Sequence, residues 1–161
     1  MVRYLIFILT LFIFGCETTN QQLINLEKLN FNEIKFKTVS KDLSYQNPLN
    51  TEDEIIYGKI IDYWFDNKIK TNGFEGNLEV QVIDLKISKF KEDSYYKVEI
   101  QLIMSFTEVY ESLNKRNLYE VESLEYGEIE GSFSIKDQEN LENNIMHKNL
   151  NNISRKLENI L

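Results

Sequence analysis

The chain has 161 residues and a formal net charge of -8 at pH 7, from 18 Lys and Arg against 26 Asp and Glu. A chain of this length forms one modest domain, and its content of 42% hydrophobic and 12% aromatic residues exceeds that of a disordered chain. The acidic balance excludes nucleic acid as a first-choice partner, because that binding needs clustered Lys and Arg. These figures predict a single packed domain.

Residues 1–15 have the pattern of a signal peptide. Arg3 supplies a short positive region, and the apolar run from Leu5 to Phe14 is interrupted only by Thr10. That run is about half the roughly 20 residues that a transmembrane helix needs. We therefore expect no permanent membrane span in this segment.

The run ends in Ile13-Phe14-Gly15-Cys16, which resembles the bacterial lipobox, the motif whose Cys is lipidated and becomes the new N-terminus. Ile13 and Gly15 match the motif, while Phe14 is bulkier than the residue usually found there. Cys16 is the only Cys in the chain, so it has no intrachain disulfide partner. We predict that Cys16 is lipidated and attaches the protein to a membrane. The alternatives are a chance Cys near an ordinary cleavage site and a buried thiol.

Removing residues 1–15 takes away Arg3 and leaves 17 basic against 26 acidic residues, a net charge of -9. Anionic headgroups repel such an acidic domain. We therefore expect the lipid alone to attach the protein to the membrane, with the domain at a distance from the membrane surface. Residues 16–32 are rich in Asn, Gln, Thr and Glu, which predicts a polar tether. A weak amphipathic helix is the alternative, because leucines recur there at helical spacing. Residues 33–161 are expected to form the periplasmic domain.

Alternation over Ile34, Phe36 and Thr38 predicts a first strand, and residues 42–50, which contain the only Pro, are expected to form a loop. A helix should begin at a capping box of Thr51 and Glu54. We expect this helix to run to about residue 71.

Gly73 is the predicted left-handed C-cap of this helix. Trp64 lies on the apolar stripe of the same helix. That spacing favours core packing over an aromatic ligand box.

Three long strands should follow. Leu78 to Ile87 changes the phase of its alternation near residue 82, which predicts a bulge, and Tyr96 to Phe106 alternates without interruption. Residues 89–94 and 112–117 are expected to be turns. The third strand, from residue 119 onward, carries a row of carboxylates at Glu120, Glu122, Glu128 and Glu130. A cation site or an acid–base pair is conceivable there, but a divalent cation needs convergent oxygens, so a solvated strand face is the preferred interpretation.

Asp137 is the expected N-cap of a final helix, in which His147 lies among polar residues and is predicted to be exposed. The whole pattern predicts an α+β fold of strand, helix, three antiparallel strands and helix. Both helices should pack on one face of a four-stranded mixed sheet, because each helix has one apolar stripe and each strand one apolar face.

Two resemblances follow from these residues. The first is to a family of small alphaproteobacterial outer-membrane lipoproteins of unassigned function, and it covers roughly the last 110 residues. Its residues are Ile60, Trp64, Gly73, Gly76, Leu78, Val82, Asp84, Ile87, Leu150-Asn151 and Leu157-Glu158. The second resemblance, carried by the lipobox and the order of elements, is to lipopolysaccharide-assembly lipoproteins and more loosely to accessory lipoproteins of ABC-type lipid transporters. The second resemblance is architectural and implies a non-catalytic partner protein at the outer membrane.

The sequence lacks a nucleophile elbow, a Gly-rich phosphate loop and a His-Glu-x-x-His motif, so we predict no catalytic, cofactor-binding or metal-binding residues. The favoured function is that of a non-enzymatic adaptor or accessory factor in outer-membrane assembly or envelope lipid transport. It would be lipid-anchored, face the periplasm and bind an unidentified envelope protein. The alternative is a periplasmic module that binds a lipid or another small ligand in a groove between sheet and helices.

Overall fold

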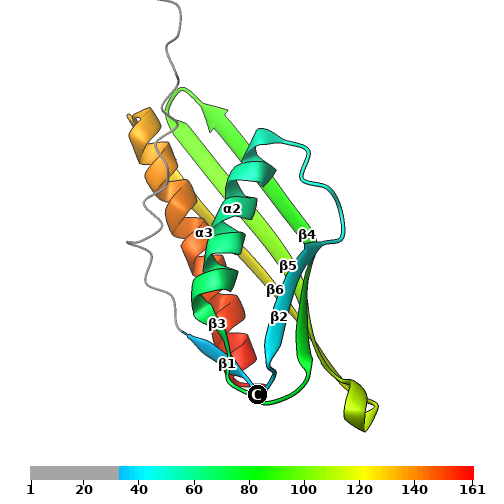
Figure 1. Cartoon of the computed structure of the whole chain (residues 1–161). Coiled ribbons are helices and arrows are strands. Elements are labelled where there is room, and N and C mark those ends of the chain that lie inside the picture. Colours follow the sequence, from blue (N-terminus) through cyan, green and yellow to red (C-terminus); the bar gives the residue numbers. More distant parts are fainter. Residues whose placement is uncertain (1–32) are drawn as a thin grey trace, which may run out of the picture.

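The computed structural model of the protein describes residues 33–161. A four-stranded sheet in the order β2-β4-β5-β6 forms one layer, and the helices α2 and α3 cover one of its faces (Figure 1). The elements are β1 Ile34–Phe36, β2 Ser40–Tyr45, α2 Glu52–Lys68, β3 Ile69–Thr71, β4 Asn77–Glu92, β5 Tyr95–Tyr110, the 3-10 turn η3 Glu111–Leu113, β6 Lys115–Glu130 and α3 Ile135–Glu158. The predicted α+β fold with a mixed sheet is confirmed. The predicted signal peptide, Cys16 and the tether lie outside the described residues.

The sheet is mixed because β2 runs parallel to β4, whereas β4, β5 and β6 are antiparallel neighbours. A register shift between Val82 and Asp84 confirms the bulge predicted near residue 82. It returns Leu85 to the face that Val80 and Val82 occupy, so the buried side of β4 continues past the bulge to Leu85.

The turn between β4 and β5 is shorter than the sequence predicts, because the strands continue to Glu92 and resume at Tyr95. Lys89 and Lys91 occupy positions of β4 that face the helices, where their amines meet polar groups of Asp53, Glu142 and Gln138. Long lysine side chains can follow an apolar surface and keep their charge at its rim. Their polarity therefore does not mark the end of the strand.

The first strand of the main sheet was predicted at the wrong residues. Ile34 to Phe36 forms β1, which pairs with β3 in a separate parallel sheet of two strands. The strand beside β4 is β2, part of which was predicted as a loop. Leu43 and Tyr45 are half-buried on the helix side, whereas Ser44 is exposed. The alternation is present in β2. Because β2 is an edge strand with one open face, it carries so many polar residues that its sequence resembles that of a loop.

Helix α2 begins at the predicted capping box, in which Thr51 Oγ1 accepts from the Glu54 amide. It ends at Lys68 instead of about residue 71. Lys41 Nζ donates to the carbonyl oxygens of Phe65 at 2.7 Å and of Ile69 at 2.8 Å, so a side chain of β2 satisfies the end of the helix.

Gly73 is therefore not the helix cap. Its amide donates to Thr38 O at 2.9 Å, and a Cβ at this position would overlap the Lys37 carbonyl. The glycine is needed because the loop after β3 lies directly against the backbone that follows β1.

The N-cap of α3 is Ser134, and not Asp137 as predicted. Asp137 is the third residue of the helix and completes a capping box, in which its carboxylate accepts from the Ser134 amide at 2.8 Å. The prediction is wrong by three residues, because Ser134 and Asp137 are the N-cap and N3 positions of the same capping box.

Trp64 is fully buried between α2 and the sheet, which confirms its predicted place in the core. Its ring meets Phe106 of β5 edge-on at 6.5 Å between centroids. The indole Nε1 donates to Ser154 Oγ of α3 at 3.3 Å, so this residue joins both helices to the sheet.

Candidate functional site

The residues that the sequence marked for possible chemistry do not converge in the structure. Cys16 lies outside the described residues. Glu120, Glu122, Glu128 and Glu130 are all exposed on the face of β6 that the helices leave open. Glu122 accepts from Gln101 Nε2 at 2.6 Å and Glu128 from Tyr95 Oη at 2.9 Å, so their partners are neutral neighbours on the same sheet face. This agrees with a solvated strand face.

His147 is half-buried on α3, whereas the sequence predicts an exposed residue. Asn151 Nδ2 lies 3.2 Å from its Nδ1, one helical turn away. The polar neighbours of His147 in the sequence suggest an exposed position. They do not show that α3 packs against β5 and β6. In residues 33–161 no group of three or more His, Cys, Asp and Glu side chains is arranged to hold a metal ion.

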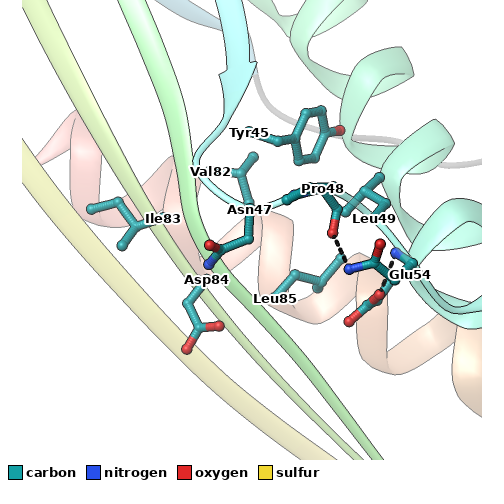
Figure 2. A pocket seen from close by; sticks show the side chains of 10 residues that line it. Tyr45, Asn47, Pro48, Leu49, Glu54, Val82, Ile83, Asp84 and Leu85 are labelled. Atoms are coloured by element: carbon teal, nitrogen blue, oxygen red, sulfur yellow. Dashed lines mark hydrogen bonds between the residues drawn. The ribbon is translucent and has the colours of Figure 1, made fainter.

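One pocket among the described residues lies where β2 ends beside the bulge of β4 (Figure 2). Gln46 N donates to Val82 O, after which the chain leaves the sheet and leads into α2. The pocket has a volume of about 130 Å³. It is lined by Tyr45, Asn47, Pro48, Leu49, Asn50, Glu54, Val82, Ile83, Asp84 and Leu85.

The polar groups around this pocket are already engaged. Glu54 accepts from the amides of Asn50 and Thr51 at 2.8 and 2.9 Å, and these bonds hold the pKa of its carboxyl below the usual value. Asp84 pairs with Lys86 at 2.8 Å. At roughly 30 Å³ per water molecule, the pocket has room for only a few waters. It offers no place for a lipid or cofactor.

Within residues 33–161, a dense polar cluster lies around Glu142 of α3, at the rim between the helices and the sheet. Its carboxylate accepts from Tyr57 Oη at 2.9 Å, from Tyr96 Oη, and from Lys89 Nζ at 2.8 Å. Lys89 also donates to Asp53 at 2.7 Å. One carboxylate thus connects α2, β4, β5 and α3.

The electrostatics of the Glu142 cluster favour a structural role. Burial, together with the neighbouring Glu142 carboxylate, raises the pKa of both Tyr57 and Tyr96. Burial lowers the pKa of Lys89, but the hydrogen bonds to Asp53 and Glu142 outweigh it and raise that pKa above its ordinary value. A tyrosine that is harder to ionise and a lysine that is held protonated are poor general bases at neutral pH. The cluster therefore fastens the layers together.

A second carboxylate, Glu108 of β5, was not singled out in the sequence analysis. It is 6% exposed and faces inward next to the end of the core. It accepts from Tyr110 Oη at 3.1 Å, Asn117 Nδ2 at 3.0 Å and Tyr119 Oη at 3.3 Å. Burial, and then the hydrogen bond to Glu108, raise the pKa of Tyr110 to about 12. The sequence could have predicted that Glu108 points inward, because it continues the alternation of the inward-facing residues Met104 and Phe106.

Within residues 33–161, the face of the sheet opposite the helices is a candidate binding surface. Figure 1 shows α2 and α3 on the same side, so neither covers this face. The large side chains that are more than half exposed there include Phe90 at 52%, Leu124 at 55% and Tyr126 at 62%. We call these three residues the outer patch. Lys97 lies beside them, with Nζ 5.4 Å from the centre of the Tyr126 ring.

The strand β6, which carries two of the outer-patch residues, is also an edge of the sheet over all its 16 residues. Part of that edge is occupied by α3, since Lys156 Nζ donates to Glu122 O at 2.5 Å. The exposed Glu side chains of β6 further discourage pairing with a strand of another copy. Side-chain contacts on the open face are thus better supported than strand addition at the edge.

No protein-family model matches the chain, and no curated protein matches it. The chain is similar to solved structures of a minor lipoprotein from Acinetobacter baumannii and of the rare lipoprotein B from Shewanella oneidensis. The first has a TM-score of 0.37 at 12% identity and covers 73% of this chain and 86% of that one. The second has a TM-score of 0.40 at 9% identity and covers 75% and 92%.

Within residues 33–161, none of the helices has the length and apolar character that crossing a bilayer requires.

Proposed function

We propose that this protein is a non-enzymatic lipoprotein, anchored in the outer membrane through Cys16, whose periplasmic domain binds an envelope protein. It would serve as an adaptor or accessory factor in outer-membrane assembly or envelope lipid transport. The observation that carries the proposal is the outer patch, a set of exposed apolar side chains on a sheet face that neither α2 nor α3 covers. Exposed apolar clusters on soluble domains commonly mark protein interaction sites.

The interior supports a protein partner over a small ligand. A lipid site would need an apolar cavity of several hundred Å³. The facing side chains of the two layers instead contact one another: Phe106 stacks on Phe36 at 6.1 Å and meets Trp64 at 6.5 Å. Leu102, at the middle of β5, is also fully buried. This arrangement favours a domain that acts through its surface.

Photocrosslinking in intact cells tests the binding surface. A photoreactive amino acid is placed at Leu124 or Tyr126 in the outer patch, and at Ile55 on α2 as a control with 44% exposure. We expect one crosslinked envelope protein from both outer-patch positions and none from Ile55. Leu124→Asp should abolish the Tyr126 crosslink at unchanged protein abundance. Crosslinks of equal yield from Ile55, or an unchanged yield in the Leu124→Asp protein, would contradict the proposal.

Cys16→Ser tests the anchor. Because Cys16 is the only Cys in the chain, the variant should lose both metabolic labelling with a fatty acid and partition into the detergent phase. The parent protein, processed in the same cells, is the reference. Equal labelling of the two proteins would refute lipidation at this residue.

A further inference from the structure

One end of the molecule combines exposed lysines with exposed apolar side chains. Figure 1 shows β1 and β3 side by side at this end, close to the C-terminus. The loops after β1 and β3 contribute to the same surface, because Gly73 N donates to Thr38 O and Val39 N donates to Gly76 O. We call this surface the β1–β3 end. It comprises the exposed residues Lys35, Lys37, Val39 and Phe74 and the half-buried Lys68 and Lys70.

The lysines of the β1–β3 end are placed side by side. In the parallel register Lys35 lies opposite Lys70, and Ile34 and Phe36 are buried, so the lysine between them points outward. Like charges directly opposite each other destabilise a sheet. Among residues 33–161 the ion pairs within 4 Å involve only Lys86, Lys89 and Lys97. The charges of the β1–β3 end are thus left for an anionic partner, although Glu33 and Glu75 are near in sequence.

The apolar members of the β1–β3 end have an unusual exposure. The Phe74 side chain is 100% exposed and Val39 is 59% exposed. Backbone hydrogen bonds of 2.9 and 3.0 Å fix the two loops that carry them against each other. An aromatic ring held out beside lysines is typical of surfaces that enter the boundary between headgroups and acyl chains.

We propose that the β1–β3 end docks on the surface of an anionic phospholipid bilayer, with Lys35 and Lys70 against phosphates and Phe74 at the acyl boundary. The inference rests on the proposed lipid anchor. The 17 residues from Cys16 to Asn32 precede this end and span at most about 60 Å when fully extended. An anchored chain therefore keeps the β1–β3 end close to lipid and raises its effective concentration there.

This orientation reverses what the net charge predicts. A charge of -9 favours a domain that stands off, but membrane attraction depends on the charges within about a Debye length of the surface. The β1–β3 end places the exposed Lys35 and Lys37 and the half-buried Lys68 and Lys70 there. An acidic protein segment could also meet lysines, but a fully exposed Phe beside the lipid-tethered end of the domain favours the bilayer.

The test uses the full-length lipidated protein reconstituted in vesicles of phosphatidylcholine alone or mixed with phosphatidylglycerol. Lysines are acylated with a water-soluble reagent and read by mass spectrometry. Phosphatidylglycerol should slow the labelling of Lys35 and Lys70 on the order of fivefold, and high salt should restore it. Lys59 and Lys148, exposed on the helices, are the internal controls and should not change.

Membrane contact of Phe74 is measured with Phe74→Trp and vesicles that contain brominated lipid. We expect quenching of this added indole but not of one introduced by Ile55→Trp on α2, while buried Trp64 gives a constant background. Equal quenching at both positions, or labelling of Lys35 that is independent of phosphatidylglycerol, would overturn the inference. Protection of Lys35 in native envelopes but not in these vesicles would overturn it as well, because it would indicate a protein ligand.

Failure of the anchor is distinguished by flotation of the same vesicles. If the full-length protein does not float with phosphatidylcholine, the proposed anchoring is wrong. If it floats, but Lys35 and Phe74 respond as the control positions do, the anchor holds and the docking of the β1–β3 end is refuted.

Discussion

The two faces of β5 differ sharply in burial. On the face toward the helices, Val98, Ile100 and Leu102 are completely buried. On the opposite face Lys97, Glu99 and Gln101 are half-exposed and next to the outer patch. Since alternate residues of one strand point to opposite sides, one stretch of sequence carries the core and the binding face separately. Changes on the first face should affect folding and changes on the second should affect binding.

The largest effect should come from the core. Trp64→Ala removes the contact with Phe106 and the hydrogen bond to Ser154, and we expect it to lower the free energy of unfolding by about 3 to 5 kcal/mol. Urea unfolding followed by circular dichroism measures the change. Trp64→Phe keeps most of the buried volume and should be less harmful. A parent-like midpoint for Trp64→Ala would show that the indole does not support the core.

The Glu142 cluster should give the next largest effect. Glu142→Gln removes the charge that faces Lys89 and one of the acceptors that Tyr57 and Tyr96 share, so a loss of about 2 kcal/mol is expected. Glu139→Gln, an exposed change on the same helix, is the matched control. Equal unfolding midpoints for the two variants would mean that the cluster does not fasten the layers.

Alkaline pH should weaken the same region. Burial raises the pKa of Tyr45, Tyr57 and Tyr96 in the folded state, so near pH 10 the unfolded chain loses these protons and the folded chain keeps them. Their contribution to stability is complete below the unfolded pKa and falls as the pH rises above about 10. Ultraviolet titration of tyrosinate should show these residues ionising together with unfolding. Titration of Tyr45, Tyr57 and Tyr96 near pH 10 in a folded protein would contradict this.

Sequence patterns predicted the parts of the fold in which one physical signal dominates. The alternation in β5, the capping box at Thr51 and the phase change near Val82 each specify local geometry, and all three were correct. The location of β2 was missed because a polar edge strand resembles a loop. The end of α2 was missed because it depends on Lys41, a tertiary contact.

The candidate surfaces were less predictable than the fold. The outer patch could be predicted only in part. The alternation along β6 shows which residues share a face, but it does not show that both helices pack on the opposite face. The β1–β3 end could not be anticipated, since Lys35 and Lys70 are brought together by a strand pairing that the sequence did not reveal. Surfaces assembled from distant segments need the topology first.

The smallest effect is expected from the carboxylates of β6. Glu120→Gln together with Glu122→Gln should change the free energy of unfolding by less than about 0.5 kcal/mol, because exposed surface changes normally do so little. The glutamine at residue 122 can still accept from Gln101 through its amide oxygen. Both side chains lie on the open face about 7 Å apart along the strand, without the burial that a general acid or base requires.

In this double variant, urea unfolding measures the stability of the core face, and the Tyr126 photocrosslink measures binding at the open face. We expect a parent-like midpoint and a parent-like crosslink, in contrast to Leu124→Asp, which should keep the midpoint and lose the crosslink. If the double variant folds normally but loses the crosslink, the partner recognises charge on β6 as well as the outer patch. The binding face would then extend along the strand toward Glu120, and the apolar side chains alone would not define it.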